Sequence, residues 1–236
     1  MGRAFEYRKA AKEKRWGKMS RVFPRLGKNI TLAAKEGGPD PDLNAKLRNA
    51  ISTAKGENMP KDNIDAAIKR ASGKDAESLV EVVYEGKGPH GVLIVIEAAT
   101  DNTTRTVANV RSYFNKANGA FVPAGSLDFM FSRKAVFEFS LPEGMDIEEL
   151  ELELIDAGLE EIEEEDGKVI AYGDYTQYGS LSKALNENGI EPEKATLERF
   201  ATTPVKFSED QLEDIEKMLG KIDEDEDVQN VFTNMG

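Results

Sequence analysis

The sequence predicts an α+β protein in which a small helical N-terminal region precedes two regions of mixed helix and strand. Apolar residues recur at three-to-four spacing in the N-terminal region, and the period shortens to that of strands from about residue 79. After residue 135 the expected order is strand, helix, strand, strand, helix, strand, which is the ferredoxin-like order. A length of 236 residues favours two or three small domains over one.

The helical region contains three expected helices. The first begins near Ser20 as its N-cap, holds Pro24 in its first turn and ends at Gly37-Gly38-Pro39. Two more are expected over residues 43–55 and 64–71. The apolar stripe of the first helix consists of Val22, Phe23, Leu26, Ile30 and Ala33. Residues 1–18 show no stable apolar face, so we expect them to form a mobile arm in the free protein.

The remaining elements follow from alternating apolar runs and helix caps. In the middle region, a helix is expected over residues 103–116, with Asp101 or Asn102 as its cap. The other elements expected there are strands over residues 79–85, 92–99 and 127–131. The ferredoxin-like region has expected strands at 136–140, 159–164, 169–172 and 194–201, with helices at 147–157 and 179–188. A helix over 209–222 and a strand over 228–232 close the chain.

Charge is distributed very unevenly along the chain. The formal net charge is −13, yet residues 1–35 contain eleven Lys/Arg against two Glu. Residues 36–75 are neutral, with seven charges of each sign. One end of the protein therefore attracts polyanions while the rest repels them, which indicates nucleic acid as the partner.

The basic region supplies the candidate nucleic-acid contacts. Lys14, Lys18, Arg21, Arg25 and Lys28 step by four and three residues, which places five cations on one helical face that can follow a phosphate backbone. The alternative is a solvated face that balances the acidic remainder. Trp16, Tyr7 or Phe5 can stack on unpaired bases. The full predicted set is Arg8, Lys9, Lys12, Lys14, Arg15, Trp16, Lys18, Arg21, Arg25, Lys28, Lys61, Lys69, Arg70 and Arg105.

Other motifs do not indicate an enzyme. Gly86–Gly91 matches G-x-G-x-x-G, but a strand follows it where a dinucleotide site needs a helix, so we interpret it as a hairpin turn. His90 is the only histidine and cysteine is absent, which excludes the usual zinc sites, and His90 is interpreted as a turn residue. No nucleophile elbow is present. We therefore expect no catalytic residues, no metal, no cofactor and no small-molecule substrate.

Two acidic runs and one arginine need separate explanations. The runs at residues 160–166 and 223–227 are expected to be solvated surface, because neither has the pattern of a calcium loop. Arg105 lies in the first turn of a helix, where a cation opposes the helix dipole. A ligand or partner anion beside Arg105 would account for its position.

Several strings together resemble the YebC/PmpR family over essentially the whole chain. The most specific are Asn58-Met59-Pro60-Lys61-Asp62 and the run from Thr100-Asp101-Asn102 to Arg105-Thr106. The chain departs from the family pattern at its start, Gly2-Arg3-Ala4-Phe5, and at Gly88-Pro89-His90-Gly91. Contacts made by the N-terminal tip of other members are therefore not carried over.

The resemblance implies three domains, with the ferredoxin-like domain inserted into the middle one. The expected division is residues 1–76, then 77–134 with 204–236, and 135–203. The family is described both as DNA-binding transcriptional regulators and as translation factors on the ribosome, including a mitochondrial translational activator. The expected function is thus a non-enzymatic regulator that binds ribosomal RNA or duplex DNA.

Two alternatives remain open: a regulator that acts on DNA only, and an acidic protein–protein adaptor. The N-terminus has no secretory signal and no apolar run has membrane-spanning length, so a cytoplasmic monomer without membrane contact is expected.

Overall fold

The computed structural model of the protein describes residues 19–73, 78–165 and 167–236. The expected mobile arm, residues 1–18, lies outside these ranges. The described chain falls into two compact units. Of the described residues, unit 1 comprises 19–25, 78–132 and 200–236, and unit 2 comprises 26–73, 133–165 and 167–199.

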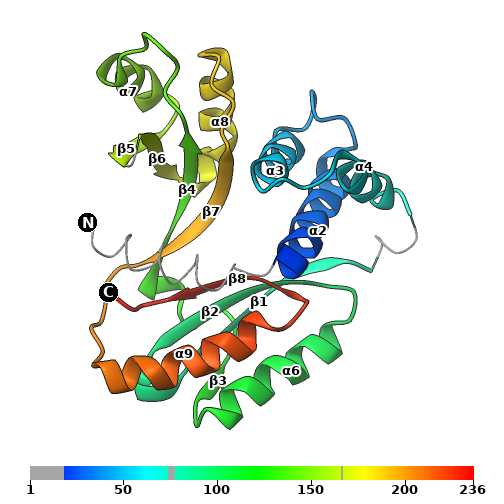
Figure 1. Ribbon diagram of the computed structural model, residues 1–236. Coiled ribbons are helices and arrows are strands. Elements are labelled where there is room, and N and C mark those ends of the chain that lie inside the picture. The colour runs from blue at the N-terminus through cyan, green and yellow to red at the C-terminus, as the bar shows by residue number, and fades with distance from the viewer. Residues whose placement is uncertain (1–18, 74–77, 166) are drawn as a thin grey trace. The chain divides into compact units, whose positions relative to one another are not determined.

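The helical part of unit 2 confirms the three expected helices. They are α2 (Met19–Gly37, whose first residues belong to unit 1), α3 (Ala45–Gly56) and α4 (Lys61–Arg70) (Figure 1). Of the predicted apolar stripe of α2, Phe23 is half-buried, and the buried members are Val22, Leu26, Ile30 and Ala33. The described helix begins at Met19, close to the predicted start, but Ser20 and Pro24 lie inside it, so the prediction of Ser20 as N-cap was wrong.

Asn44 explains how the chain turns from α2 into α3. Its side-chain oxygen accepts the amide of Leu47, which caps α3, while its Nδ2 donates to the carbonyls of Ala33 and Gly38 at 2.8 and 2.9 Å. A side chain at Gly37 would meet the Asn44 amide at 2.6 Å, so only glycine fits there.

The second part of unit 2 has the predicted ferredoxin-like fold. Its sheet has the strand order β5-β6-β4-β7, and β6 pairs in antiparallel fashion with both β4 and β5. Helices α7 and α8 bury Leu150, Leu154, Leu181 and Leu185 against the sheet. The elements are β4 (Phe131–Phe139), α7 (Ile147–Ile155), β5 (Leu159–Glu165), β6 (Lys168–Asp174), η3 (Tyr175–Gln177), α8 (Tyr178–Glu187) and β7 (Lys194–Ala201).

Within unit 2, polar contacts join α3 to the ferredoxin-like part. The buried Asn49 amide donates to the hydroxyls of Ser182 and Tyr178, each at 3.0 Å. Ser52 donates to the carbonyl of Pro192. Buried hydrogen bonds of this kind fix one packing arrangement, because each lost partner leaves a costly unsatisfied group.

Unit 1 is a four-stranded antiparallel sheet covered on one face by two helices (Figure 1). The strand order is β3-β1-β2-β8, so the last strand returns to pair with β2 as the resemblance implied. Helices α6 and α9 enclose a core that includes Ile94, Phe114 and Leu219. The elements are β1 (Val80–Lys87), η1 (Pro89–Gly91), β2 (Leu93–Thr100), α6 (Thr103–Lys116), β3 (Ala120–Val122), α9 (Glu209–Asp223) and β8 (Val228–Thr233).

The predicted strand over residues 127–131 was wrong. Residues Asp128–Met130 form the short helix η2, and strand β4 begins only at Phe131. The buried carboxylate of Glu85 accepts hydrogen bonds from the amides of Gly125 and Leu127 at 2.8 and 2.7 Å, which turns the chain before it can pair as a strand.

Within the described residues, no helix has both the length and the apolar character needed to cross a bilayer.

Candidate nucleic-acid interface

Half of the predicted interface lies outside the described residues. This group is Arg8, Lys9, Lys12, Lys14, Arg15, Trp16 and Lys18. Arg21 belongs to the first described turns of α2. The positions of the other predicted residues can be compared directly with the expectation.

Arg25 is engaged inside unit 1. Its guanidinium Nη1 lies 3.0 Å from a carboxylate oxygen of Asp223, and its Nη2 donates to the Asp223 carbonyl at 2.7 Å. Both side chains are about nine-tenths buried. A guanidinium held by two hydrogen bonds in a buried ion pair does not face a phosphate backbone, so the five-cation stripe is interrupted at this position.

The guanidinium group of Arg105 is bound by two carboxylates of the protein itself. Its Nη2 lies 2.9 Å from a carboxylate oxygen of Asp101 and 2.8 Å from one of Asp227. Hydrogen bonds to Asp227 and then Asp101 raise the pKa of the guanidinium above its usual value. The ligand suggested by its position at a helix N-terminus is therefore not required, because these two carboxylates offset the unfavourable dipole.

Asp227 is the centre of a buried hydrogen-bond network. One of its carboxylate oxygens accepts from the hydroxyls of Thr100 at 3.2 Å and Thr106 at 2.8 Å, besides the guanidinium of Arg105. The backbone amide of Ala99 donates to the Asp227 carbonyl. The Thr100-to-Thr106 string that resembles the family thus has a structural role, since it joins the end of β2, the start of α6 and the loop before β8.

The expectation that residues 223–227 are solvated surface was wrong. Asp223, Asp225 and Asp227 are buried, while Glu224 and Glu226 between them are exposed. We call these three aspartates the carboxylate cluster. The segment leads from the last residue of α9, Asp223, through a turn to the first residue of β8, Val228.

The third member of the cluster, Asp225, binds helix α6. It accepts from the amide of Asn109 at 3.0 Å and from the hydroxyl of Tyr113 at 2.8 Å. Burial and this hydrogen bond raise the pKa of Tyr113 well above its usual value. Each aspartate of the cluster therefore has side-chain donors of its own.

The predicted cations of α4 are exposed. Lys61 lies in the first turn of α4. Lys69 and Arg70 lie in its last turn, where the negative end of the helix dipole stabilises cations. Asp62 and Asp65 are exposed on the same helix, so its surface carries mixed charge. Lys28 on α2 is half-buried. These four predicted cations come from two helices, α2 and α4.

Some exposed cations of the helical region were not predicted. Lys35 and Lys55 are exposed near the C-terminal ends of α2 and α3, and Lys46 pairs with Glu36. The sequence signal of Lys46 and Lys55 was weak, because residues 36–75 have equal numbers of the two charges.

The glycine-rich string forms a hairpin turn, as predicted. Strands β1 and β2 pair up to Lys87 and Leu93, and His90 lies in the turn with a left-handed φ of 58°. Its Nε2 lies 3.0 Å from a carboxylate oxygen of Asp214.

In the part of the chain that the structure describes, no group of three or more His, Asp or Glu side chains is placed to hold a metal ion.

Comparison with known proteins identifies close relatives. Residues 3–74 match the family model of the TACO1/YebC N-terminal domain, and residues 79–235 match that of the TACO1/YebC second and third domain. The chain is 66% identical over its whole length and the relative's whole length to a probable transcriptional regulatory protein of Wolinella succinogenes. It is 63% identical, again with both chains fully covered, to a protein of the same description from Sulfurimonas denitrificans.

A solved structure has the same fold. The crystal structure of a conserved hypothetical protein from Aquifex aeolicus matches with a TM-score of 0.78 and 32% identity. The match covers 94% of this chain and 92% of that one. The arrangement of helices and sheets described above is therefore shared with an experimentally determined relative.

Proposed function

The chain belongs to the TACO1/YebC family, and from that premise we propose that it is a non-enzymatic regulator of gene expression that binds nucleic acid through its basic N-terminal region. The observation that carries the proposal is the eleven Lys/Arg against two Glu in residues 1–35 of a chain with net charge −13. Cations concentrated at one end steer that end toward phosphates.

The described cations divide into two groups with different roles. Exposed Lys61, Lys69 and Arg70 are available to a phosphate backbone, and they extend the proposed interface beyond residue 35. Arg25 and Arg105 are left out of it, because their guanidinium groups already bind Asp223, Asp101 and Asp227. The interface is thus smaller than the sequence predicted.

Two targets are compatible with this surface. The relatives from Wolinella and Sulfurimonas are named probable transcriptional regulatory proteins, which favours DNA. The acidic remainder of the chain favours a large RNA–protein partner, because a bare duplex would be repelled along most of the surface. We propose the ribosome as the first target to test and transcriptional control through DNA as the second candidate.

The test is a charge reversal with a matched control. The variant Lys14→Glu/Lys18→Glu/Arg21→Glu removes three cations from the basic region without touching the Arg25 ion pair. The control Lys87→Glu/Lys183→Glu/Lys206→Glu changes the net charge by the same amount at exposed lysines outside residues 1–35. Binding to ribosomes and to a DNA duplex is measured over a range of salt concentrations.

We expect the N-terminal variant to lose affinity for its target and the control to keep most of it. Each phosphate contact that is lost lowers the slope of log affinity against log salt by roughly 0.7–0.9. Equal affinity and equal salt slope for the wild type and the N-terminal variant would reject the proposed interface. Equal losses in the two variants would mean that net charge alone governs binding.

A further inference from the structure

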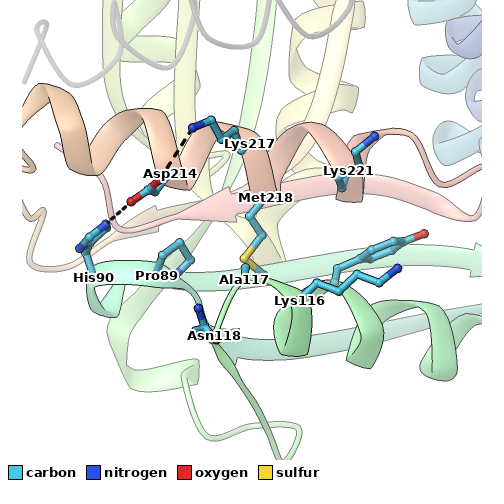
Figure 2. Close-up of a pocket in the computed structure, with 10 residues that line it drawn as sticks. Pro89, His90, Lys116, Ala117, Asn118, Asp214, Lys217, Met218 and Lys221 are labelled. Carbon is cyan, nitrogen blue, oxygen red and sulfur yellow. Dashed lines mark hydrogen bonds and ion pairs between the residues drawn. The ribbon is translucent and has the colours of Figure 1, made fainter.

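Unit 1 contains a cavity of about 660 Å³ on a surface remote in sequence from the basic region. Three segments form it: the β1–β2 turn, the C-terminal end of α6 and the side of α9 that carries Asp214, Lys217, Met218 and Lys221 (Figure 2). Its volume lies within the range of about 300–1,000 Å³ that is typical of small-molecule sites.

Local geometry explains why these segments open toward one another. Helix α6 ends at Lys116, and Asn118 just beyond it has a left-handed φ of 54°, which turns the chain away. On α9, Asp214, Lys217, Met218 and Lys221 follow the three-and-four spacing of one helical face. The turn at Asn118 therefore shapes the wall from α6, and the helical spacing shapes the wall from α9.

The cavity collects cations in an otherwise acidic unit. Residues 78–132 and 200–236 contain seven Lys/Arg against fifteen Asp/Glu, and Lys116, Lys217 and Lys221 all line the cavity. Of the other four cations, Arg105 binds two carboxylates and Arg111 lies over the ring of Phe121 at 5.1 Å. The cavity is therefore lined by three of the seven Lys/Arg residues of this acidic unit.

The ammonium groups of the three lysines can bind an anionic ligand without breaking a strong interaction. Lys116 has no ion-pair or hydrogen-bond partner within residues 19–73, 78–165 and 167–236. Lys217 lies 3.0 Å from Glu213, and Lys221 lies 3.0 Å from Glu224, with all four side chains at least half exposed. Ion pairs exposed to solvent in this way are weak, so a more highly charged anion displaces them readily.

The floor of the cavity is apolar. Met218 is only 4% exposed, and Pro89 and Ala117 are half-buried beside it. His90 pairs with Asp214 at one edge (Figure 2). A ligand that fits both features has an anionic group for the lysines and an apolar or aromatic part for the floor.

We propose that this cavity binds a small phosphomonoester with an apolar or aromatic part. A phosphomonoester carries close to two negative charges and three strong acceptor oxygens, which suit three lysine ammonium groups. An extended nucleic acid fits less well, because neighbouring phosphates would cross the acidic residues of α9, including Glu209, Asp210 and Glu216. None of the residues that line the cavity belongs to the proposed nucleic-acid interface, so the two proposals are tested with different variants.

The experiment is titration of the full-length protein with three probes, followed by calorimetry and by amide chemical shifts. The probes are adenosine monophosphate, 4-nitrophenyl phosphate and uncharged adenosine. The cavity variant is Lys116→Gln/Lys221→Gln. The control is Lys183→Gln/Lys206→Gln, which removes the same charge at exposed lysines that do not line the cavity.

We expect saturable binding of at least one phosphomonoester, amide shifts confined to residues 90–91, 113–118 and 214–221, and no binding of adenosine. Affinity falls at least about tenfold in the cavity variant, because two of the three charge-assisted contacts are lost, and stays unchanged in the control. Absence of saturable phosphomonoester binding, or equal losses in both variants, would overturn the proposal.

A third outcome separates this site from the proposed function. If the phosphomonoesters do not bind but the cavity variant loses affinity for ribosomes or duplex DNA, the lysines belong to the nucleic-acid surface and the small-ligand proposal fails. If the phosphomonoesters bind while the Lys14→Glu/Lys18→Glu/Arg21→Glu variant keeps its nucleic-acid affinity, the cavity proposal stands and the proposed function fails.

Discussion

Two acidic runs that look alike in the sequence have opposite environments in the structure. Residues 160–165 lie on β5, at the edge of the ferredoxin-like sheet, where Glu160 has an exposed pairing with Lys134 at 2.7 Å. Burial first, and then the nearby charges of Glu163 and Glu161 among others, raise the pKa of Tyr172, as negative charge near a phenol does. Residues 223–227 instead bury three carboxylates.

The difference lies in the donors that the fold brings to each run. Arg25, Arg105 and Tyr113 come from helices far from residue 223 in the sequence, and each binds one member of the carboxylate cluster. Burying a carboxylate is tolerated only when such partners are present. Composition alone therefore does not distinguish a structural acidic run from a solvated one.

The largest effect is expected at Asp227. Asp227→Ala leaves the hydroxyls of Thr100 and Thr106 without their acceptor and removes the buried partner of Arg105. The free energy of unfolding should fall by about 3 kcal/mol or more, measured by urea denaturation followed by circular dichroism. Asp227→Asn retains an acceptor oxygen and should lose less. A change below about 1 kcal/mol for Asp227→Ala would contradict the assigned network.

The Arg25–Asp223 ion pair comes next. A double-mutant cycle with Arg25→Met and Asp223→Asn should give a coupling free energy of about 1–3 kcal/mol, because the pair is buried and has a second hydrogen bond to the Asp223 carbonyl. Arg25→Lys should restore only part of it, since one ammonium cannot form both bonds in the same geometry. Additive single effects would mean that Arg25 does not depend on Asp223.

Asp225 should give a smaller effect that depends on pH. The pKa of Tyr113 is raised in the folded protein, so its contribution to stability is complete below about pH 10, the usual value, and declines as the pH rises above it. Stability measured between about pH 8 and pH 11 should therefore fall less steeply in Tyr113→Phe than in the wild type. In Asp225→Asn, carbon-13 shifts of Tyr113 should show a lower pKa, and an unchanged value would contradict the hydrogen bond.

The smallest effect is expected in the solvated run. Glu164→Gln, at an exposed position of β5, should change the free energy of unfolding by less than about 0.5 kcal/mol in either direction, since surface substitutions rarely do more. A loss as large as that of Asp227→Ala would remove the contrast between the two runs.

Much of the fold was predictable because local signals were strong. Helix α6 begins and ends where its cap and apolar spacing placed it, and the ferredoxin-like order followed from the alternation of elements. The strand predicted over residues 127–131 failed because the buried Glu85, about forty residues before it in the chain, holds that segment in a turn. Such a contact has no local signature.

The candidate site was less predictable for the same reason. Helical spacing put Arg25 on the predicted cationic face of α2, but Arg25 is buried, because it pairs with Asp223, which lies 198 residues away in the sequence. The three lysines of the cavity come from two helices about one hundred residues apart. Only the tertiary structure brings these charges together.

The most direct test of the proposed function is co-sedimentation of the protein with ribosomes at near-physiological salt, with and without excess duplex DNA. The full-length protein is compared with a truncated variant that lacks residues 1–18 but keeps all of α2, including the buried Leu26 and Ile30. We predict that the full-length protein sediments with ribosomes in the presence of DNA and that the truncated protein does not. Release by DNA would move the target to the duplex, and undiminished sedimentation of the truncated protein would contradict the N-terminal interface.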